Sequence, residues 1–174
     1  MYFLTLVSAS RRPIFSDDAA RGMLRQAIEE AQSLLPFTLV ASVLMPEHLH
    51  VMMRLPEGQS DYPCRVSKIK RNFTARFLAQ GGVEAAVRPG KARQRYRGVW
   101  QPRFMEHTIR DYRDYKLHLD YIHANPVKHA LVAWPRDWPW STFHGYVKKG
   151  EYAPDWCGHI ELPGGVDIEP QGWA

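Results

Sequence analysis

The chain has 174 residues, a usual length for one domain with a substantial hydrophobic core. Hydrophobic residues make up 45% of it and charged residues 24%, as in ordinary soluble globular proteins, and no apolar run is long enough to span a membrane. The net charge of +5 favours a polyanionic partner. Cys64 and Cys157 stand in unrelated contexts, which argues against a disulfide framework or a cysteine zinc site and favours a reducing compartment.

The first part of the chain alternates predicted strands with a helix. Residues 2–9 are rich in strand-forming residues and have no basic residue before them, so we expect a strand and not a signal peptide. Residues 16–35 are expected to form a packing helix that ends at Pro36. A second strand is expected at 37–44. The predicted buried stripe of the helix is Ala20, Leu24, Ala27, Ala31 and Leu34.

The main candidate site lies in the next strand, within MPEHLHVMMRLPEG at residues 45–58. Side chains two apart on a strand point to one face, so His48 and His50 are expected to lie close enough to bind one metal ion. The alternative is a pair of exposed histidines on an edge strand that bind nothing. Glu47 could be a ligand or a base, but its position favours a solvated turn. The opposite, apolar face is Leu49, Val51, Met53 and Leu55.

Residues 61–79 are expected to form a basic helix, with Asp61 as its cap and Pro63 in its first turn. The predicted buried stripe is Val66, Ile69, Phe73 and Phe77. The positive charges are Arg65, Lys68, Lys70, Arg71 and Arg76. Such a run is typical of a solvated face, but the helix interior holds no acid, which favours a face turned toward phosphate.

Residues 83–98 are expected to be a loop in which basic residues surround Tyr96. Basic residues with an interleaved aromatic suit a nucleic-acid backbone and a stacked base, and a solubilising loop is the alternative. The residues predicted to contact DNA, from the basic helix, this loop and the segment after it, are Arg65, Lys68, Arg71, Arg93, Arg95, Arg97 and Arg103.

A strand is expected at 99–109, and Pro102 places it at an edge or a bulge. A third helix is expected from residue 111 to about residue 125, because a proline follows there. Its predicted core stripe is Tyr112, Tyr115, Leu119 and Ile122, and a neighbouring face carries His118, Tyr121 and Asn125. From residue 134 the chain is rich in aromatic residues, so it is expected to pack back over the core, with a loose end in the last dozen residues.

Tyr121 and Asn125 would join the histidine pair if the third helix crossed the histidine face of the sheet. Asn125 could then offer an amide oxygen to the metal, and Tyr121 would lie beside the same ion. A tyrosine hydroxyl, with a pKa of about 10, is a poor nucleophile at neutral pH. A metal on the scissile phosphate would remove charge from it and orient the attack. A phosphotyrosine link would conserve the bond energy, so that a strand could be cut and rejoined.

Two stretches, MPEHLHVMMRLPEG and YIHANPVKHALV, resemble the two signatures of REP-associated tyrosine transposases, which belong to the single-tyrosine HUH group. VWQPRFMEHTIRD and DWPWSTFHGY are also similar to that family, so the resemblance covers roughly residues 2–156. The HxH strand alone is a weak signal. Its combination with WQPRFMEH and DYIHANPVKH, in that order, makes the resemblance specific.

The resemblance implies an α+β fold: a single domain with an antiparallel sheet flanked by helices, ferredoxin-like in plan. Residues 1–133 would form this HUH domain, with the aromatic tail, 134–174, packed on it. The implied reaction is metal-dependent cleavage and joining of single-stranded DNA. Tyr121 would form a 5′-phosphotyrosine and leave a free 3′-OH, and His48, His50 and Asn125 would hold the metal.

The implied substrate is the hairpin of a single-stranded REP palindrome, with a short guide sequence at its foot. The implied protein is cytoplasmic, bacterial and nucleoid-associated, and it acts as a monomer; a dimer, as in the mobile relatives, is the alternative. Two imidazoles and an amide bind manganese or zinc more tightly than magnesium; the resemblance implies Mg²⁺ or Mn²⁺. Mobile relatives carry glutamine where Asn125 stands, so the shorter amide would need a closer helix. The loop 83–98 belongs to no signature, and its DNA role rests on charge alone.

Two other functions fit parts of the pattern. A histidine-triad nucleotide hydrolase would need a third histidine at position 52, where the chain has Met52. A domesticated protein that holds DNA hairpins without cutting them would not need Tyr121 together with both histidines. A structural role is the ordinary expectation for a helical tyrosine, but the predicted core stripe of the helix does not need Tyr121.

Overall fold

The computed structural model describes residues 1–86 and 97–157. In this part of the chain an antiparallel sheet has the strand order β2-β3-β1-β4. The strands are β1 (Tyr2–Val7), β2 (Thr38–Leu44), β3 (His48–Arg54) and β4 (Met105–Thr108). One helix connects β1 to β2 and another connects β3 to β4, which is the ferredoxin-like plan. The predicted α+β fold is therefore confirmed.

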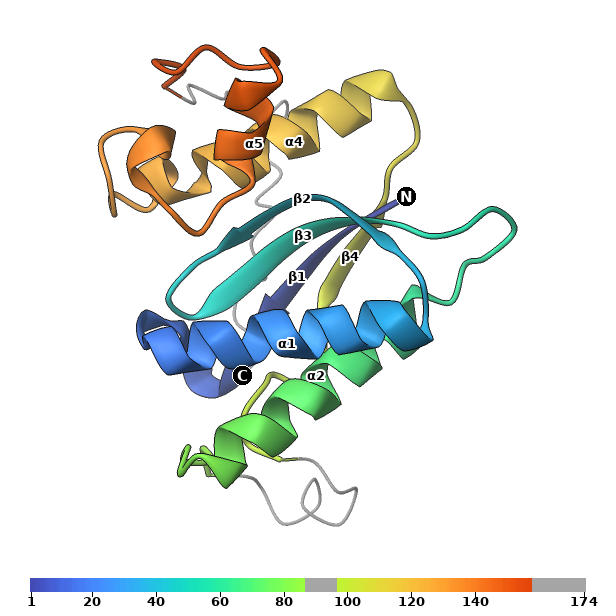
Figure 1. Ribbon diagram of the computed structural model, residues 1–174, viewed down its shortest axis with the longest axis vertical. Coiled ribbons are helices and arrows are strands. Elements are labelled where there is room, and N and C mark those ends of the chain that lie inside the picture. Colours follow the sequence, from blue (N-terminus) through green and yellow to red (C-terminus); the bar gives the residue numbers. More distant parts are fainter. Residues whose placement is uncertain (87–96, 158–174) are drawn as a thin grey trace.

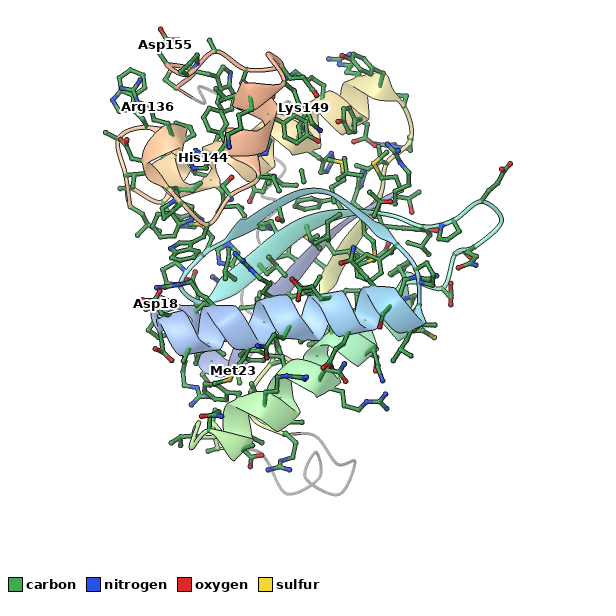
Figure 2. All side chains as sticks on the ribbon, in the orientation of Figure 1. Asp18, Met23, Arg136, His144, Lys149 and Asp155 are labelled. Carbon is green, nitrogen blue, oxygen red and sulfur yellow. The ribbon has the colours of Figure 1, made fainter. Side chains whose placement is uncertain are left out.

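Helices cover both faces of the sheet (Figure 1). On one face lie α1 (Asp18–Leu34) and α2 (Tyr62–Ala79). On the other lie α4 (Tyr112–Lys128) and the short α5 (Phe143–Lys148). Single 3-10 turns occur at Ala9–Arg11, Ile14–Ser16 and Pro135–Asp137. The sheet is thus the middle layer of three, and side chains fill the space between the layers (Figure 2).

Successive side chains of β1 and β3 point to opposite faces of the sheet, and they contribute to two hydrophobic cores, one on each face. Leu49, Val51 and Met53 point toward α1 and α2, whereas Met52 points toward α4. Because both central strands are covered on both faces, β3 is buried from its first residue to Met53. Burial of each such large side chain contributes about 1.5–3 kcal/mol. The histidines of β3 therefore lie inside the protein, beneath α4.

The first two helices follow the sequence closely. The carboxylate of Asp17 accepts hydrogen bonds from the backbone N–H groups of Ala19 and Ala20, which caps α1. The prediction that Leu34 is buried is wrong: its side chain is 62% exposed, because the last turn of α1 extends past the buried stripe. On α2, three of the four predicted core residues are buried, and Phe77 packs against them partly buried.

Helix α4 continues beyond its predicted end. It includes Pro126 and runs to Lys128. Proline has no N–H to donate, but the next turn is closed because the N–H of His129 donates to the carbonyl of Asn125. Tyr112 is 78% exposed, so its predicted place in the core stripe is wrong; it is the first residue of the helix and lies beyond the covered part of the sheet.

The strand predicted at 99–109 is shorter, because only Met105–Thr108 pair with β1. Trp100 makes an isolated bridge to Ser8, and its ring packs against Phe15 and Phe73. Pro102, which cannot donate to a ladder, lies between this bridge and β4. The strand is at the edge of the sheet, as predicted.

The aromatic tail packs over α4 as far as the structure describes it. Phe143, Tyr146, Tyr152 and Trp156 belong to the second core together with Leu119 of α4. The predicted loose end lies outside the described residues. Cys64 and Cys157 are free thiols. None of the helices in the described ranges is both long and apolar enough to cross a membrane.

Candidate metal and nucleophile site

The two histidines of β3 face each other beneath α4. The Nε2 atoms of His48 and His50 are 3.0 Å apart, and the two rings are nearly perpendicular, at 76°. Both residues are almost fully buried, at 2% and 1% exposure. The strand geometry therefore brings together the two imidazoles that the sequence predicted as metal ligands, with one nitrogen of each directed at the other.

The outer nitrogens of both rings have fixed partners. His48 Nδ1 lies 2.9 Å from the Glu47 carboxylate, which can only accept, so this nitrogen carries the proton and Nε2 keeps its lone pair. His50 Nδ1 lies 2.8 Å from the hydroxyl of Thr5 on the adjacent strand. Partners of this kind orient metal-binding histidines and select their tautomer. Glu47 is thus not a solvated turn residue, as the sequence suggested, but an anchor for His48.

The environment keeps the His50 ring neutral. Burial lowers the pKa of His50 well below its usual value, and Coulombic interactions with His48, His129, Lys128 and Arg11 lower it further. The pKa of the Glu47 carboxyl is lowered, chiefly by its hydrogen bond with His48. Neutral imidazole is the form that binds metal. The ring is therefore in the state a ligand needs.

Helix α4 lies across this pair. The ring of Tyr121 is 5.3 Å from that of His50, and the ring of His129 is 5.7 Å from that of His48. Asn125 is midway between these two residues, four positions from each, so it is on the same helical face. The structure therefore brings Tyr121 and Asn125 to the histidine face, the arrangement on which the predicted site depends.

The side chain of Asn125 supports a ligand at this place. It is fully buried, and neither its amide oxygen nor its amide nitrogen has a hydrogen-bond partner among the described residues. Leaving a buried polar group unsatisfied costs about 1–3 kcal/mol. A metal ion held by two imidazoles would give the amide oxygen its missing partner, so the residues present fit a divalent cation.

Two cations, Lys128 and Arg11, lie beside the site, and the sequence did not predict them there. Lys128 Nζ lies 5.1 Å from the centre of the Tyr121 ring, and Arg11 pairs with Glu47 at 3.5 Å. Arg11 has a positive φ of 50°, in a turn that no periodicity signals. Lys128 was expected to lie beyond the end of the helix. Cations beside a site attract phosphate groups.

The predicted DNA-binding residues divide into three groups. Arg65 is only 1% exposed; its guanidinium donates to the carbonyl of Pro36 at 3.0 and 3.1 Å and pairs with Asp61. The prediction that it contacts DNA is wrong, because it joins α2 to the chain before β2. Arg93 and Arg95 lie outside the described residues. The residues that stay predictions are Lys68, Arg71, Arg97 and Arg103.

The structure also contains a group that the sequence analysis did not assemble. His107 of β4 and Asp114 and His118 of α4 offer ligand atoms that all lie within 4.8 Å of one another, and such a group could hold a metal ion. It differs from the predicted set of His48, His50 and Asn125. The signal was present in the sequence as an i, i+4 pair of acid and histidine that follows a strand histidine.

No family model matches the chain. It is 39% identical over 164 residues to a putative REP-associated tyrosine transposase of Haemophilus influenzae, covering 93% of this chain and 90% of the relative. It is 43% identical over 138 residues to the REP-associated tyrosine transposase of Escherichia coli, covering 79% and 73%. A solved REP-associated tyrosine transposase bound to a REP hairpin has 38% identity and a TM-score of 0.76, covering 92% of this chain and 87% of that one. The chain therefore belongs to the family of REP-associated tyrosine transposases.

Proposed function

We propose that the protein is a metal-dependent strand transferase that cuts and rejoins single-stranded DNA at REP-type hairpins, with Tyr121 as its nucleophile. The observation that carries the proposal is the convergence of Tyr121, the His48–His50 pair and the unpartnered amide of Asn125 on one buried face. A structural tyrosine would not need two facing imidazoles beside it.

His48, His50 and Asn125 would hold the ion, which we propose is Mg²⁺ or Mn²⁺. When bound, the ion would withdraw charge from the scissile phosphate. Glu47 and Thr5 hold the two imidazoles in orientation. The ammonium of Lys128, above the Tyr121 ring, stabilises negative charge that develops on the phenol oxygen.

The reaction exchanges one phosphodiester for another. The Tyr121 oxygen forms a bond to phosphorus and the bond from phosphorus to O3′ breaks. The phenol proton passes through solvent to the departing O3′, which leaves a free 3′-OH and a 5′-phosphotyrosine. Attack of a 3′-OH on this phosphotyrosine reverses the steps and rejoins DNA. No external energy source is needed.

The hairpin is proposed as substrate because a solved relative is described as bound to a REP hairpin. Arg71 and Arg103 are exposed and are proposed as phosphate contacts with Lys68 and Arg97. Both histidines, Tyr121 and Asn125 come from one chain, so a monomer carries the complete proposed site. We propose that it acts on nucleoid DNA in the cytoplasm. Residues 1–133 carry the site, and the tail from 134 supports α4.

A covalent-adduct assay tests the proposal. A single-stranded REP-type hairpin labelled at its 3′ end is incubated with protein and Mn²⁺, and protein-linked DNA is resolved on a denaturing gel. We expect an adduct that chelator and the Tyr121→Phe substitution abolish. Tyr112→Phe is the matched control, because Tyr112 is on the same helix and 78% exposed, and it should form the adduct normally. An adduct that persists in Tyr121→Phe contradicts the assignment.

A hairpin-binding protein without cleavage activity is the second candidate. It is favoured by the burial of Tyr121, which is only 2% exposed, so DNA reaches the phenol only if covering side chains move. Hairpin affinity measured in parallel with the adduct separates the two functions. Tight binding without an adduct in Mg²⁺, Mn²⁺ or Zn²⁺ would establish the binding function. Absence of both would contradict both candidates.

A further inference from the structure

We propose that His107, Asp114 and His118 form a second metal site, one that takes a divalent transition ion such as Zn²⁺ and fastens the start of α4 to the edge strand β4. The proposal is independent of DNA cleavage. It rests on three residues outside the His48–His50 site, and it can be measured without DNA.

The geometry is that of a small donor cluster. His107 Nε2 lies 2.8 and 3.0 Å from the two carboxylate oxygens of Asp114. His118 Nδ1 lies 2.8 Å from the backbone carbonyl oxygen of Asp114 and 3.0 Å from its carboxylate. The two imidazole rings are stacked, with centres 4.5 Å apart. One ligand comes from a strand and two come from successive turns of a helix, so the fold fixes their relative positions. Two imidazoles and a carboxylate suit zinc and its neighbours better than magnesium or calcium.

The surroundings of the cluster suit a cation. The Asp114 side chain is only 9% exposed, and its carboxylate lies against both imidazoles and accepts a hydrogen bond from the backbone N–H of Arg110 at 3.0 Å. The guanidinium of Arg110 lies 3.5 Å from the carboxylate but is 75% exposed, so solvent screens its charge. The three groups thus converge on one largely buried carboxylate, and a divalent ion bound there would be held by an anion and two imidazoles.

The site also has access and a supporting contact. The His107 side chain is 32% exposed, so an ion can enter from solvent. On the inner side, the ring of Phe3 packs against His118 at 4.9 Å and against Tyr121 at 5.9 Å. An ion here would therefore brace the helix that carries the proposed nucleophile, one turn before it.

Equilibrium dialysis against Zn²⁺ tests the proposal in the His48→Ala/His50→Ala variant, which removes the first site. We expect this variant to retain one ion per chain. Adding His107→Gln should remove that ion, and adding Asp114→Asn should do the same. The matched control adds His144→Gln, which removes a histidine of α5 that bonds the carbonyl of Trp138 (Figure 2). This control should keep the ion.

Circular dichroism confirms that each variant is folded, and His107→Gln is the safest of them because its side chain is partly exposed. Zinc should also raise the melting temperature of the His48→Ala/His50→Ala variant, and His107→Gln should abolish that rise. If the His48→Ala/His50→Ala variant binds no zinc, or if His107→Gln leaves zinc binding and the melting shift unchanged, the cluster is a hydrogen-bonded network and the proposal is wrong.

Discussion

The Nε2 atoms of His48 and His50 lie 3.0 Å apart inside the protein, each on a ring whose other nitrogen is already engaged. Two lone pairs at this distance repel, so the space between them must hold a proton or a cation. With His50 neutral and His48 oriented by Glu47, the pair can accept an ion without moving the backbone. The predictions below follow from this arrangement.

Thr5→Val should weaken metal binding at the His48–His50 site by about 10–100-fold, because His50 loses the hydrogen-bond partner that orients its ring. Mn²⁺ titration calorimetry in the His107→Gln background measures this site alone. Thr108→Val, on the exposed edge of the sheet, is the control and should bind as the parent does. An unchanged affinity in Thr5→Val would show that the hydroxyl does not position the ring.

Lys128→Gln should slow adduct formation by about 3-fold at saturating hairpin, because a cation over an aromatic ring contributes about 0.5–1 kcal/mol at an exposed site. Single-turnover kinetics with Mn²⁺ measure the step. Lys149→Gln removes an equivalent contact, 5.3 Å above the Tyr146 ring, and should react at the parent rate. Equal slowing in both variants would remove Lys128 from the mechanism.

Two arginines of α2 should behave differently. Arg71→Ala should weaken hairpin binding and reduce the slope of log affinity against log salt by about 1, without a change in stability. Arg65→Ala should lower the free energy of unfolding by about 2 kcal/mol, because Pro36 loses two buried hydrogen bonds. Salt-dependent fluorescence anisotropy and urea unfolding distinguish them. The reverse pattern would return Arg65 to the DNA-binding surface.

The free energy of unfolding should decrease as the pH is lowered, because of His123. Its ring is fully buried, and Nε2 donates to the Thr142 hydroxyl oxygen at 3.0 Å, because that hydroxyl gives its own proton to the carbonyl of Ser42. Burial lowers the pKa of His123 to about 3. In the unfolded chain His123 has a pKa of about 6.5 and binds a proton below that pH, whereas in the folded protein it stays neutral down to about pH 3. The stability that is present above pH 6.5 is therefore lost as the pH decreases toward 3. At pH 5 the loss is about 2 kcal/mol relative to pH 7.

The variant His123→Phe replaces the imidazole with an aromatic ring that does not titrate, so it removes the contribution of His123. Burial also lowers the pKa of His50 and of His118, and these two groups act in the same direction in both proteins. Urea unfolding at a series of pH values between 5 and 7 should give a shallower dependence in the variant, by about one proton. Parallel curves for the two proteins would mean that His123 is not the group that titrates.

The sequence was sufficient for β1, β2 and β3 and for the pairing of His48 with His50 on one face, because a period of two determines which side chains of a strand share a face. It predicted that Tyr121 and Asn125 share a helical face, for the same kind of reason. The sequence-based prediction that Arg65 contacts DNA was wrong, because charge alone does not reveal that its guanidinium donates to the carbonyl of Pro36. The sequence also failed for Glu47, which sits in a turn where its hydrogen bond with His48 depends on side-chain geometry.

The remaining differences depend on tertiary contacts. Helix α4 continues through Pro126 because it packs against the sheet, although the residue before a proline locally disfavours helical backbone. Arg11 reaches the site through a turn with left-handed backbone, for which no sequence pattern existed. The His107–Asp114–His118 group needs β4 beside the first turns of α4, a neighbourhood that only the folded chain provides.

The measurement that tests the central claim most directly is the identification of the residue joined to DNA. The adduct formed with Mn²⁺ and a REP-type hairpin is digested with protease and nuclease, and the nucleotide-bearing peptide is sequenced by mass spectrometry. The account predicts a 5′-phosphate on Tyr121, within the peptide that contains Asn125. A phosphate on Tyr115, Tyr112 or any other residue would contradict it.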